Sequence, residues 1–242
     1  MNKKNKGIIG IVASILLIVA VSVFNIDIEN LDFVNNYLNS NNYKNEQIIG
    51  NLIDTKEKYI EINNNIPYFT EEEKITTKDF EIYSELDYLD RPLVAYAKIT
   101  NKIMPKEERG SIGHIKPAGW HSIKYDIVDG KYLYNRCHLI GFQLAGENDN
   151  EKNLITGTRY FNVDGMLPFE DKVAEYVKKS NNSVLYRVTP IYKNENLVAN
   201  GVTIEAYSIE DKGQGICFNV YIPNIEPGIY IEYLTGDSCL EN

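Results

Sequence analysis

Positive charge is in short supply in this sequence. The 242 residues include 25 Lys and Arg against 34 Asp and Glu, which gives a formal net charge of −9 at pH 7. Without three lysines near the start, Lys3, Lys4 and Lys6, the balance becomes 22 against 34, or −12. Because an acidic surface repels nucleic acid at long range, the composition argues against a scaffold that binds DNA by bulk charge. It still allows a local basic cleft.

Long hydrophobic runs are absent except at one place, residues 7–24, where GIIGIVASILLIVAVSVF follows the basic MNKKNK. A basic start before an apolar run is typical of a signal peptide or an N-terminal membrane anchor, so residues 1–24 are assigned to that role. The run is at the lower edge of what spans a ~30 Å hydrocarbon core. Bulky residues flank Ala20 and Ser22, which favours a retained anchor in the membrane over cleavage. In either case the body is expected to be extracellular, secreted or tethered to the outer face of the cell membrane.

Cysteine is also scarce, with only Cys137, Cys217 and Cys239. In an oxidising compartment a Cys217–Cys239 bridge is the favoured pairing, because both residues lie in the C-terminal quarter of the chain. Cys137 stands beside His138, but no second histidine lies nearby in the sequence to complete a cysteine-based site. A small apolar filler is the favoured interpretation of Cys137.

The remaining sequence divides into an Asn-rich spacer at residues 25–58 and a packed domain at residues 59–242. The spacer is polar and weakly periodic, and no internal repeat is visible. In the domain, alternating apolar residues predict a strand at 91–100, and Asp129-Gly130 predicts a hairpin turn. A helical or irregular connection is expected at 70–87, a polar loop at 147–162 and a helix at 166–180. Four more strands follow, at 182–192, 200–210, 215–224 and 228–234. The pattern predicts an α+β fold with a central antiparallel sheet and flanking helices.

The stretch KYLYNRCHLIGFQL, residues 131–144, places Arg136 and His138 two apart at the end of an apolar segment. A histidine can act as a general base near neutral pH, since its unperturbed pKa is about 6.5. On a strand, Arg136 would share the face of His138, where a guanidinium can meet the charge of a reacting phosphate. The alternative is that both residues only satisfy hydrogen bonds or an ion pair, usually worth under about 1 kcal/mol.

Oxygen donors for a metal ion follow downstream. Mg²⁺ prefers oxygen ligands and keeps most of its waters, so one or two protein oxygens suffice. Asn162 and Glu170 are eight residues apart and would lie on similar faces of one helix, although Gly165 and Pro168 argue against an unbroken helix. Asn162 as a helix N-cap and Glu170 as a partner of the helix dipole are the structural alternatives.

The segment from Asn135 to Val177 resembles the DNA/RNA non-specific endonucleases, also called ββα-metal or His-Me finger nucleases. It looks closest to the secreted streptococcal DNases and the membrane-anchored competence nuclease of Gram-positive bacteria. The family pattern is Asp-Arg-Gly-His or Asn-Arg-x-His, and this chain has Asn135, Arg136, Cys137 and His138. The resemblance extends from Tyr59 to the C-terminus and is densest from Leu93 to Tyr192.

The resemblance implies a role for each matching residue within a ββα-metal catalytic motif. His138 is the general base that activates water, and Asn162 holds a single Mg²⁺ (with Mn²⁺ able to substitute) through its amide oxygen. Glu170 acts through metal-bound waters. Asn153 and Asn135 shape the site from behind these residues. Arg136 contributes to catalysis.

Three departures from the family pattern affect the expected site. Cys137 replaces a Gly or Ser, and Asn135 replaces an Asp, which removes a negative charge that could orient His138. An arginine found a turn after the glutamate in some members is Ala174 here, so Arg159 or Lys172 would have to supply that charge.

Substrate contacts are expected in the Gly- and Lys-rich loop before the motif. Lys116 and Trp120 lie between His114 and His121. Aromatic stacking with cationic contacts is how unpaired strands are held, so Lys116 and Trp120, together with Arg159, are the candidate substrate-binding residues. Both histidines have an alternative role as loop hydrogen-bonders.

The sequence therefore predicts an exported Mg²⁺-dependent endonuclease that cleaves DNA, with RNA undecided, through contacts to phosphate and with little sequence preference. The main alternative is a surface-tethered receptor on the same fold that binds nucleic acid and cleaves it weakly or not at all. Another phosphodiesterase and a structural cell-surface module are further alternatives. The oligomeric state and the biological role, in DNA uptake, scavenging or defence, stay open.

Overall fold

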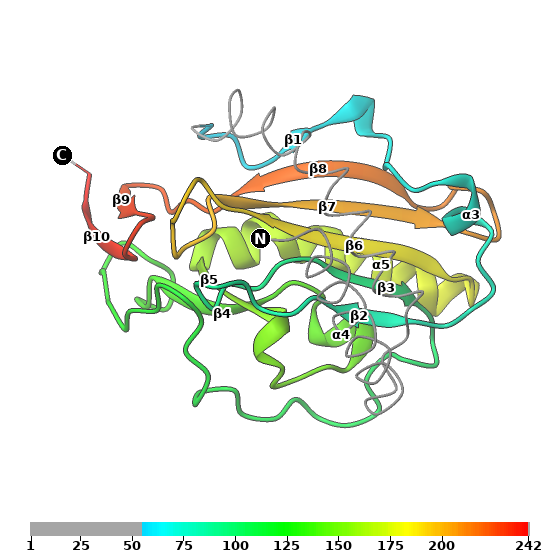
Figure 1. The fold of residues 1–242 in the computed structure, drawn as a ribbon, viewed down its shortest axis with the longest axis horizontal. Helices are drawn as coiled ribbons and strands as arrows, with labels where there is room; N and C mark the ends of the chain where they lie inside the picture. Colours follow the sequence, from blue (N-terminus) through cyan, green and yellow to red (C-terminus); the bar gives the residue numbers. More distant parts are fainter. Residues whose placement is uncertain (1–54, 242) are drawn as a thin grey trace, which may run out of the picture. The chain divides into compact units, whose positions relative to one another are not determined.

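The structure is a computed structural model, and it describes residues 55–241 (Figure 1). The leader expected at residues 1–24 and nearly all of the spacer expected at 25–58 lie outside the described residues. Among the residues that are described, no helix is both long enough and apolar enough to cross a membrane. The first strand begins at Ile60, one residue after the expected start of the packed domain.

A six-stranded sheet forms the centre of the domain, with the order β1-β8-β7-β6-β3-β2 and antiparallel pairing throughout. The strands are β1 (Ile60–Glu61), β2 (Glu81–Tyr83), β3 (Ala95–Ile99), β6 (Val184–Ile191), β7 (Gly201–Ser208) and β8 (Cys217–Pro223). The three longest strands are rich in Val, Ile and Tyr, which suit a pleated sheet covered on both faces. This central sheet and its flanking helices confirm the predicted α+β fold.

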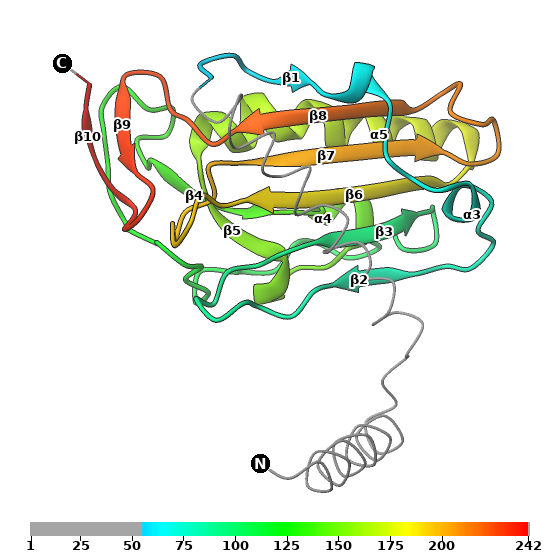
Figure 2. The ribbon, with the colours of Figure 1, turned by 45° about the horizontal axis from the view of Figure 1, so that its top comes forward.

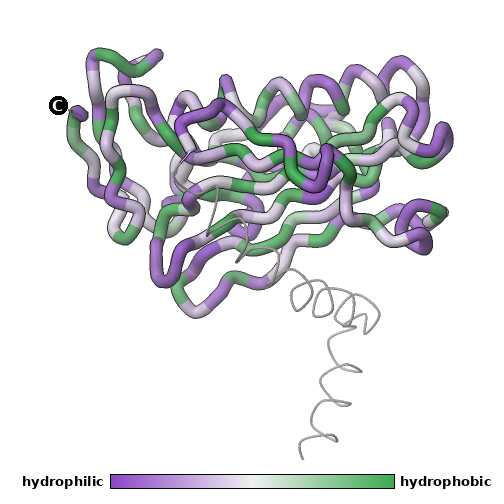
Figure 3. Tube along the Cα trace, turned by 90° about the horizontal axis from the view of Figure 1, so that it is seen from above, coloured by the Kyte–Doolittle hydropathy of each residue, from purple (hydrophilic) through white to green (hydrophobic). Residues whose placement is uncertain are grey.

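Side chains alternate between two covered faces of the sheet. On β6, Val184, Tyr186 and Val188 point into the main hydrophobic core, while Arg187 points to the opposite face and is buried there. Such alternation follows from the period of two along a strand. Figure 3 shows hydrophobic segments along the strands and hydrophilic ones in the connecting loops.

A ββα unit packs against the core face of the sheet. Strand β4 (Tyr134–His138) pairs antiparallel with β5 (Leu154–Thr158), and the chain then enters a π-helix, η3 (Phe161–Met166), that continues into α5 (Leu167–Ser180). The buried side chains of Cys137, Ile155, Phe161, Val173 and Val177 join this unit to the sheet in one cluster. Helix α5 covers the sheet from behind in Figures 1 and 2.

The helix is continuous through the two residues that were expected to interrupt it. Pro168 closely follows the π-helix η3, in the first turn of α5, so the residue without a backbone N–H lies where the hydrogen-bond pattern changes from the π to the α register. Gly165 faces strand β8, because a Cβ on it would lie 2.7 Å from Cγ2 of Ile222. The glycine therefore allows close packing of η3 on the sheet.

The other elements are short. Strands β9 (Ile229–Glu232) and β10 (Asp237–Leu240) form a separate hairpin at one end of the sheet (Figure 2), packed on a second hydrophobic cluster around Leu133, Tyr134 and Trp120. The remaining helical segments are η1 (Asn63–Asn65), α3 (Glu71–Lys74), α4 (Phe142–Ala145) and η2 (Glu151–Asn153). A capping box at Thr70 and Glu73 starts α3.

Several local predictions were wrong. The polar loop expected at 147–162 contains β5, whose five residues are all buried against β4 and the core. The connection at 70–87 includes β2, a short edge strand. At Asp129-Gly130 the chain turns, with φ of 69° at both Gly130 and Lys131, but the expected hairpin reduces to one bridge between Lys124 and Tyr132.

The favoured disulfide was also wrong. All three cysteines are free, with Cys137 buried and the other two exposed. Cys217 begins β8, and β9 and β10 follow the other end of that strand, so the sheet keeps Cys217 and Cys239 apart (Figure 1).

Candidate active site

His138 is the last residue of β4, and only 6% of it is exposed. Its Nε2 lies 2.8 Å from the backbone oxygen of Asn148, and its Nδ1 lies 3.3 Å from Nη2 of Arg109. Because a carbonyl oxygen only accepts hydrogen bonds, Nε2 carries the proton and Nδ1 carries the lone pair. The fold thus fixes the tautomer of a neutral imidazole.

The environment keeps this imidazole neutral. Burial lowers the pKa of His138 to about 4, the hydrogen bond to Asn148 opposes that shift, and the positive charge of Arg109 adds to it. A histidine with a lowered pKa is unprotonated at neutral pH and is able to accept a proton at Nδ1. A surface hollow of about 510 Å³, lined in part by Gly110, Phe142 and Asn148, adjoins this position.

Asn153 fixes the chain that follows His138. It is fully buried, and its carboxamide accepts a hydrogen bond from the Ile140 N–H at 2.9 Å and donates one to the Ile140 carbonyl at 3.0 Å. The Leu139 N–H also donates to the backbone oxygen of Asn153. Asn153 therefore extends the pairing of β4 and β5 beyond His138 by means of a side chain.

Glu170 lies in the first turn of α5 and is buried, with 9% exposed. Gly141 packs against its carboxylate so closely that an added Cβ would lie 2.6 Å from Cδ of Glu170. Burial raises the pKa of Glu170 to about 7, and Gln143 and Arg109 act in the opposite direction. Arg109 affects the pKa of both His138 and Glu170. Gly141, which packs on Glu170, follows His138 by three residues, so we infer that His138 and Glu170 lie in the same region.

Asn162 lies in the π-helix η3 and is half-buried. In the described part of the chain its carboxamide has no hydrogen-bond partner. The Leu167 N–H donates to the Asn162 backbone carbonyl, five residues earlier, as in a π-turn. Eight residues make about 2.2 turns of an α-helix. A π-turn rotates less per residue, so it brings Asn162 and Glu170 closer to one common face.

These two residues fit a hard cation. The carboxamide oxygen of Asn162 and the buried carboxylate of Glu170 are the oxygen donors that Mg²⁺ prefers. Residues 55–241 hold no group of three or more His, Cys, Asp or Glu that could bind a metal. An ion held directly by Asn162 and through bound waters by Glu170, as the resemblance implies, would need no such group.

Arg136 organises the preceding loop. Its Nε donates to the Ile115 carbonyl, its Nη2 donates to the Gly113 carbonyl at 2.8 Å, and its guanidinium carbon lies 4.0 Å from the centre of the Trp120 ring. No hydrogen bond links Arg136 to His138 among the residues described. The structure therefore gives Arg136 and Trp120 contacts that hold the loop beside β4.

The other predicted residues are spread around the site. Arg159 donates from Nε and Nη2 to one oxygen of Asp129, at 3.0 and 2.8 Å. Lys116 is exposed and lines a hollow of about 580 Å³ on the same loop. Asn135 is half-buried in β4, opposite Gly157 of β5.

Arg109 is the residue that the sequence reasoning missed. Ala174, where some family members carry an arginine, is buried in the core and faces the sheet. Lys172 lies over the Phe218 ring, and Arg159 is paired with Asp129. Arg109 instead brings a guanidinium to His138 from an irregular loop, where no periodic pattern distinguishes it from its neighbours.

Known proteins share the sequence family and the fold. Residues 64–210 match the family model for DNA/RNA non-specific endonuclease. The fold is similar to the crystal structure of NucA from Streptococcus agalactiae with a magnesium ion bound, with a TM-score of 0.66 and 27% identity over 75% of this chain and 87% of that chain. It is also similar to Sda1 nuclease with a bound zinc ion, with a TM-score of 0.58 and 28% identity over 67% of this chain and 80% of that chain.

A structure described as an extracellular endonuclease shares the fold at 20% identity and a TM-score of 0.54, over 75% of this chain and 96% of that chain. The family match covers most of the sheet and the whole ββα unit. This chain belongs to the DNA/RNA non-specific endonuclease family.

Proposed function

We propose that this chain is an exported, Mg²⁺-dependent endonuclease that hydrolyses phosphodiester bonds of DNA with little sequence preference, with His138 as its general base. The observation that carries the proposal is the His138 tautomer. A neutral ring donates Nε2–H to the Asn148 carbonyl and presents the Nδ1 lone pair to the cationic Arg109, which also acts on the buried Glu170. That arrangement is suited to removing a proton from water next to an anionic substrate.

In the proposed reaction, the Nδ1 atom of His138 takes a proton from a water molecule as its oxygen bonds to phosphorus. The bond from phosphorus to the 3′ oxygen breaks, and the departing oxygen takes a proton from solvent. Arg109, now 3.3 Å from Nδ1, is an exposed residue and would turn its guanidinium toward the phosphate oxygens when substrate enters. Asn153 keeps the ring in place through Ile140.

Asn162 and Glu170 are the residues that would hold the metal ion. When bound, the ion supplies positive charge that stabilises the reacting phosphate and the leaving oxygen. Support for Mg²⁺ comes from the oxygen donors themselves and from NucA, which was crystallised with magnesium. Mn²⁺ would substitute, because it binds the same oxygen ligands.

Contacts to phosphate explain a lack of sequence preference, since base edges carry the sequence information. The same contacts would accept RNA. Export is proposed from the basic start and the apolar run at residues 7–24, which would also anchor the chain in a membrane if retained. Residues 25–58 would then act as a spacer, and residues 59–242 as the nuclease domain.

Digestion of plasmid DNA by the purified protein tests the proposal. We expect cleavage with Mg²⁺, arrest by EDTA, and a loss of about 10²–10⁴-fold in kcat for His138→Ala. His114→Ala is the matched control, an exposed histidine with no hydrogen bond or ion pair to His138 or Glu170 among the described residues, and should keep the wild-type kcat. Full activity in His138→Ala would reject the assigned base. DNA that is bound by the wild type but keeps its length would favour the receptor alternative.

A further inference from the structure

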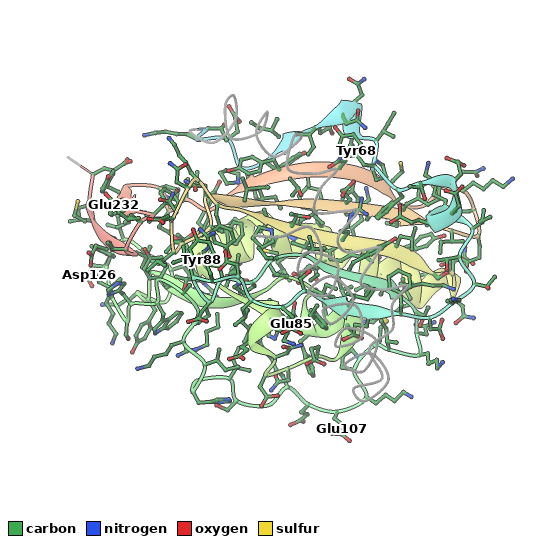
Figure 4. All side chains as sticks on the ribbon, in the orientation of Figure 1. Tyr68, Glu85, Tyr88, Glu107, Asp126 and Glu232 are labelled. Carbon is green, nitrogen blue, oxygen red and sulfur yellow. The ribbon has the colours of Figure 1, made fainter. Side chains whose placement is uncertain are left out.

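The connection between β3 and β4, residues 100–133, contains no helix or strand beyond the single Lys124–Tyr132 bridge. In Figure 1 it sweeps along the lower edge of the domain, and Figure 4 marks two points on it, Glu107 and Asp126. Connections of this length without secondary structure are uncommon in compact domains and usually carry function.

Side chains of the ββα unit and of the C-terminal hairpin hold this connection. Arg136 binds the carbonyls of Gly113 and Ile115, as described above. The Thr156 hydroxyl donates to the Ala118 carbonyl at 2.9 Å, and His121 Nε2 donates to the Thr235 carbonyl at 3.1 Å. The connection is therefore fixed on the side of the domain that carries His138.

The charge of this region differs from that of the chain as a whole. Residues 101–140 contain seven Lys and Arg against four Asp and Glu, or +3, in a chain whose net charge is −9. Elsewhere most described cations have a carboxylate partner, as in Lys98–Asp79, Lys152–Glu85 and Arg187–Glu205. Within the described part of the chain, this region holds cations with no ion-pair partner: Lys106, Arg109, Lys116, Lys124 and Arg136. A polyanion is the complementary ligand for such a row.

Two of these cations sit on aromatic rings. Arg136 lies 4.0 Å from the centre of the Trp120 ring, and the Nζ of Lys124 lies 4.4 Å from the centre of the Tyr132 ring. Tyr132 remains 49% exposed. Tyr132 precedes His138 by six residues, at most about 20 Å of extended chain. That span matches about six nucleotides at the ~3.4 Å spacing of a B-form strand, and fewer of an extended strand.

We propose that Lys124 and Tyr132 form a distal subsite for a single strand of nucleic acid, a few nucleotides away from the phosphate that is cleaved. The inference rests on the proposed nuclease function and deepens it. Tyr132 stacks on an unpaired base and Lys124 contacts the adjacent phosphate, a combination that single-strand-binding proteins use. An unpaired strand is required because only unstacked bases expose a face to the ring.

Steady-state cleavage of a 24-nucleotide single strand and of a dinucleotide tests the subsite. Lys124→Ala and Tyr132→Ala should each raise KM for the 24-mer about five- to tenfold. Neither should change KM for the dinucleotide, whose single phosphodiester occupies the cleavage position and leaves no nucleotide to reach Tyr132. Tyr132→Phe should behave as wild type, and Lys193→Ala, which removes an exposed unpaired lysine outside the connection, should change nothing. An unchanged KM for the 24-mer, or an equal rise for both substrates, overturns the subsite.

Binding separates this inference from the proposed hydrolysis. In a His138→Ala background, fluorescence anisotropy measures the affinity for a labelled 24-mer without cleavage. Adding Lys124→Ala should weaken binding about five- to tenfold and lower the slope of log K against log salt by about 0.7. If the wild type cleaves no substrate, the proposed function is wrong. If Lys124→Ala does not change the salt slope, the subsite is wrong.

Discussion

Two buried glutamates on opposite sides of the sheet have opposite surroundings. Glu205, in β7, is 3% exposed and accepts hydrogen bonds from the Arg187 Nε at 2.8 Å and from the Tyr68 N–H at 2.6 Å. Arg187 also pairs with Glu73 and lies 4.5 Å from the Phe69 ring. Glu170 is buried nearly as well, yet it has no arginine or lysine in ion-pair contact among the described residues, and burial raises its pKa to about 7.

This difference in surroundings distinguishes a glutamate that stabilises the fold, Glu205, from a candidate functional one, Glu170. A buried charge that is fully paired ties the segment around Tyr68 and Phe69 to the sheet and leaves nothing for a ligand to satisfy. A buried carboxylate without a cation is costly to the fold, and such groups are found where a ligand or a reaction uses them. Breaking each arrangement should therefore give opposite results for stability and activity.

Arg187→Ala should have the largest effect on stability. It leaves Glu205 buried without its partner, which costs about 3–5 kcal/mol in the free energy of unfolding. Nuclease activity measured well below the lowered melting temperature should stay at the wild-type level. Urea unfolding measures the loss, and the double variant Arg187→Met with Glu205→Leu should recover part of it, because it leaves no charge buried in the sheet although Glu73 and the Tyr68 N–H lose these partners. A loss of activity without a loss of stability would contradict the comparison.

Glu170→Gln should produce the reverse. It keeps the volume of the side chain and removes an unpaired buried charge, so the free energy of unfolding in EDTA should not fall. Activity with Mg²⁺ should drop about 10- to 100-fold, as for residues that orient a metal site. Asp171→Asn, an exposed neighbour on the same turn, is the matched control. A melting temperature well below that of wild type would show that Glu170 is structural.

Asn153→Ala should lower both stability and activity, because Asn153 is buried in the fold and also fixes the chain next to His138. It removes both partners of Ile140, which should cost about 1–3 kcal/mol in stability. Activity should also fall, because the chain after His138 is no longer fixed. Asn153→Asp keeps the acceptor for the Ile140 N–H and should lose less of each. Equal activity in Asn153→Ala and wild type would show that the position of His138 does not depend on this side chain.

The elements with a strong local period were predictable from the sequence. The alternation in β3 and in β6 to β9 and the amphipathic pattern of α5 identified these elements within a few residues. Strand β5 was missed because its sequence, LITGT, lies between polar residues. The strand is buried because it pairs with β4 and packs on the core. The π-turn at η3 was missed as well, since a 3.6-residue pattern contains no signal for an i to i+5 bond.

The candidate site could be proposed from the sequence to the extent that it lies on the ββα unit. His138, Asn153, Asn162 and Glu170 come from one continuous segment that resembles the family, and their roles stay predictions. Arg109 lies about thirty residues earlier along the chain, in a loop that reaches His138 only through tertiary contacts. Its position depends on how residues 100–133 are held, which no local pattern encodes.

The smallest expected effect is on the pH dependence of activity, which follows the protonation of His138. With a pKa of about 4, His138 is about nine-tenths neutral at pH 5, whereas an ordinary histidine would be about one-thirtieth neutral there. Activity should therefore persist at pH 5, with an acidic limb of kcat/KM well below 6.5. The unfolded chain binds a proton between pH 6.5 and 4 that the folded chain does not, so this residue's contribution to stability is complete above about 6.5 and is lost toward pH 4.

Arg109→Gln removes a positive charge that lowers the pKa of His138, so the acidic limb should move to higher pH. Lys106→Gln, on the same connection but without contact to His138, should leave the limb in place. An acidic limb near 6.5 in the wild type would mean that burial does not govern this imidazole. If the acidic limb does not move in Arg109→Gln, the guanidinium acts only on the substrate. Glu170 would then be the one residue whose charge state distinguishes the site from the paired charges on the other face of the sheet.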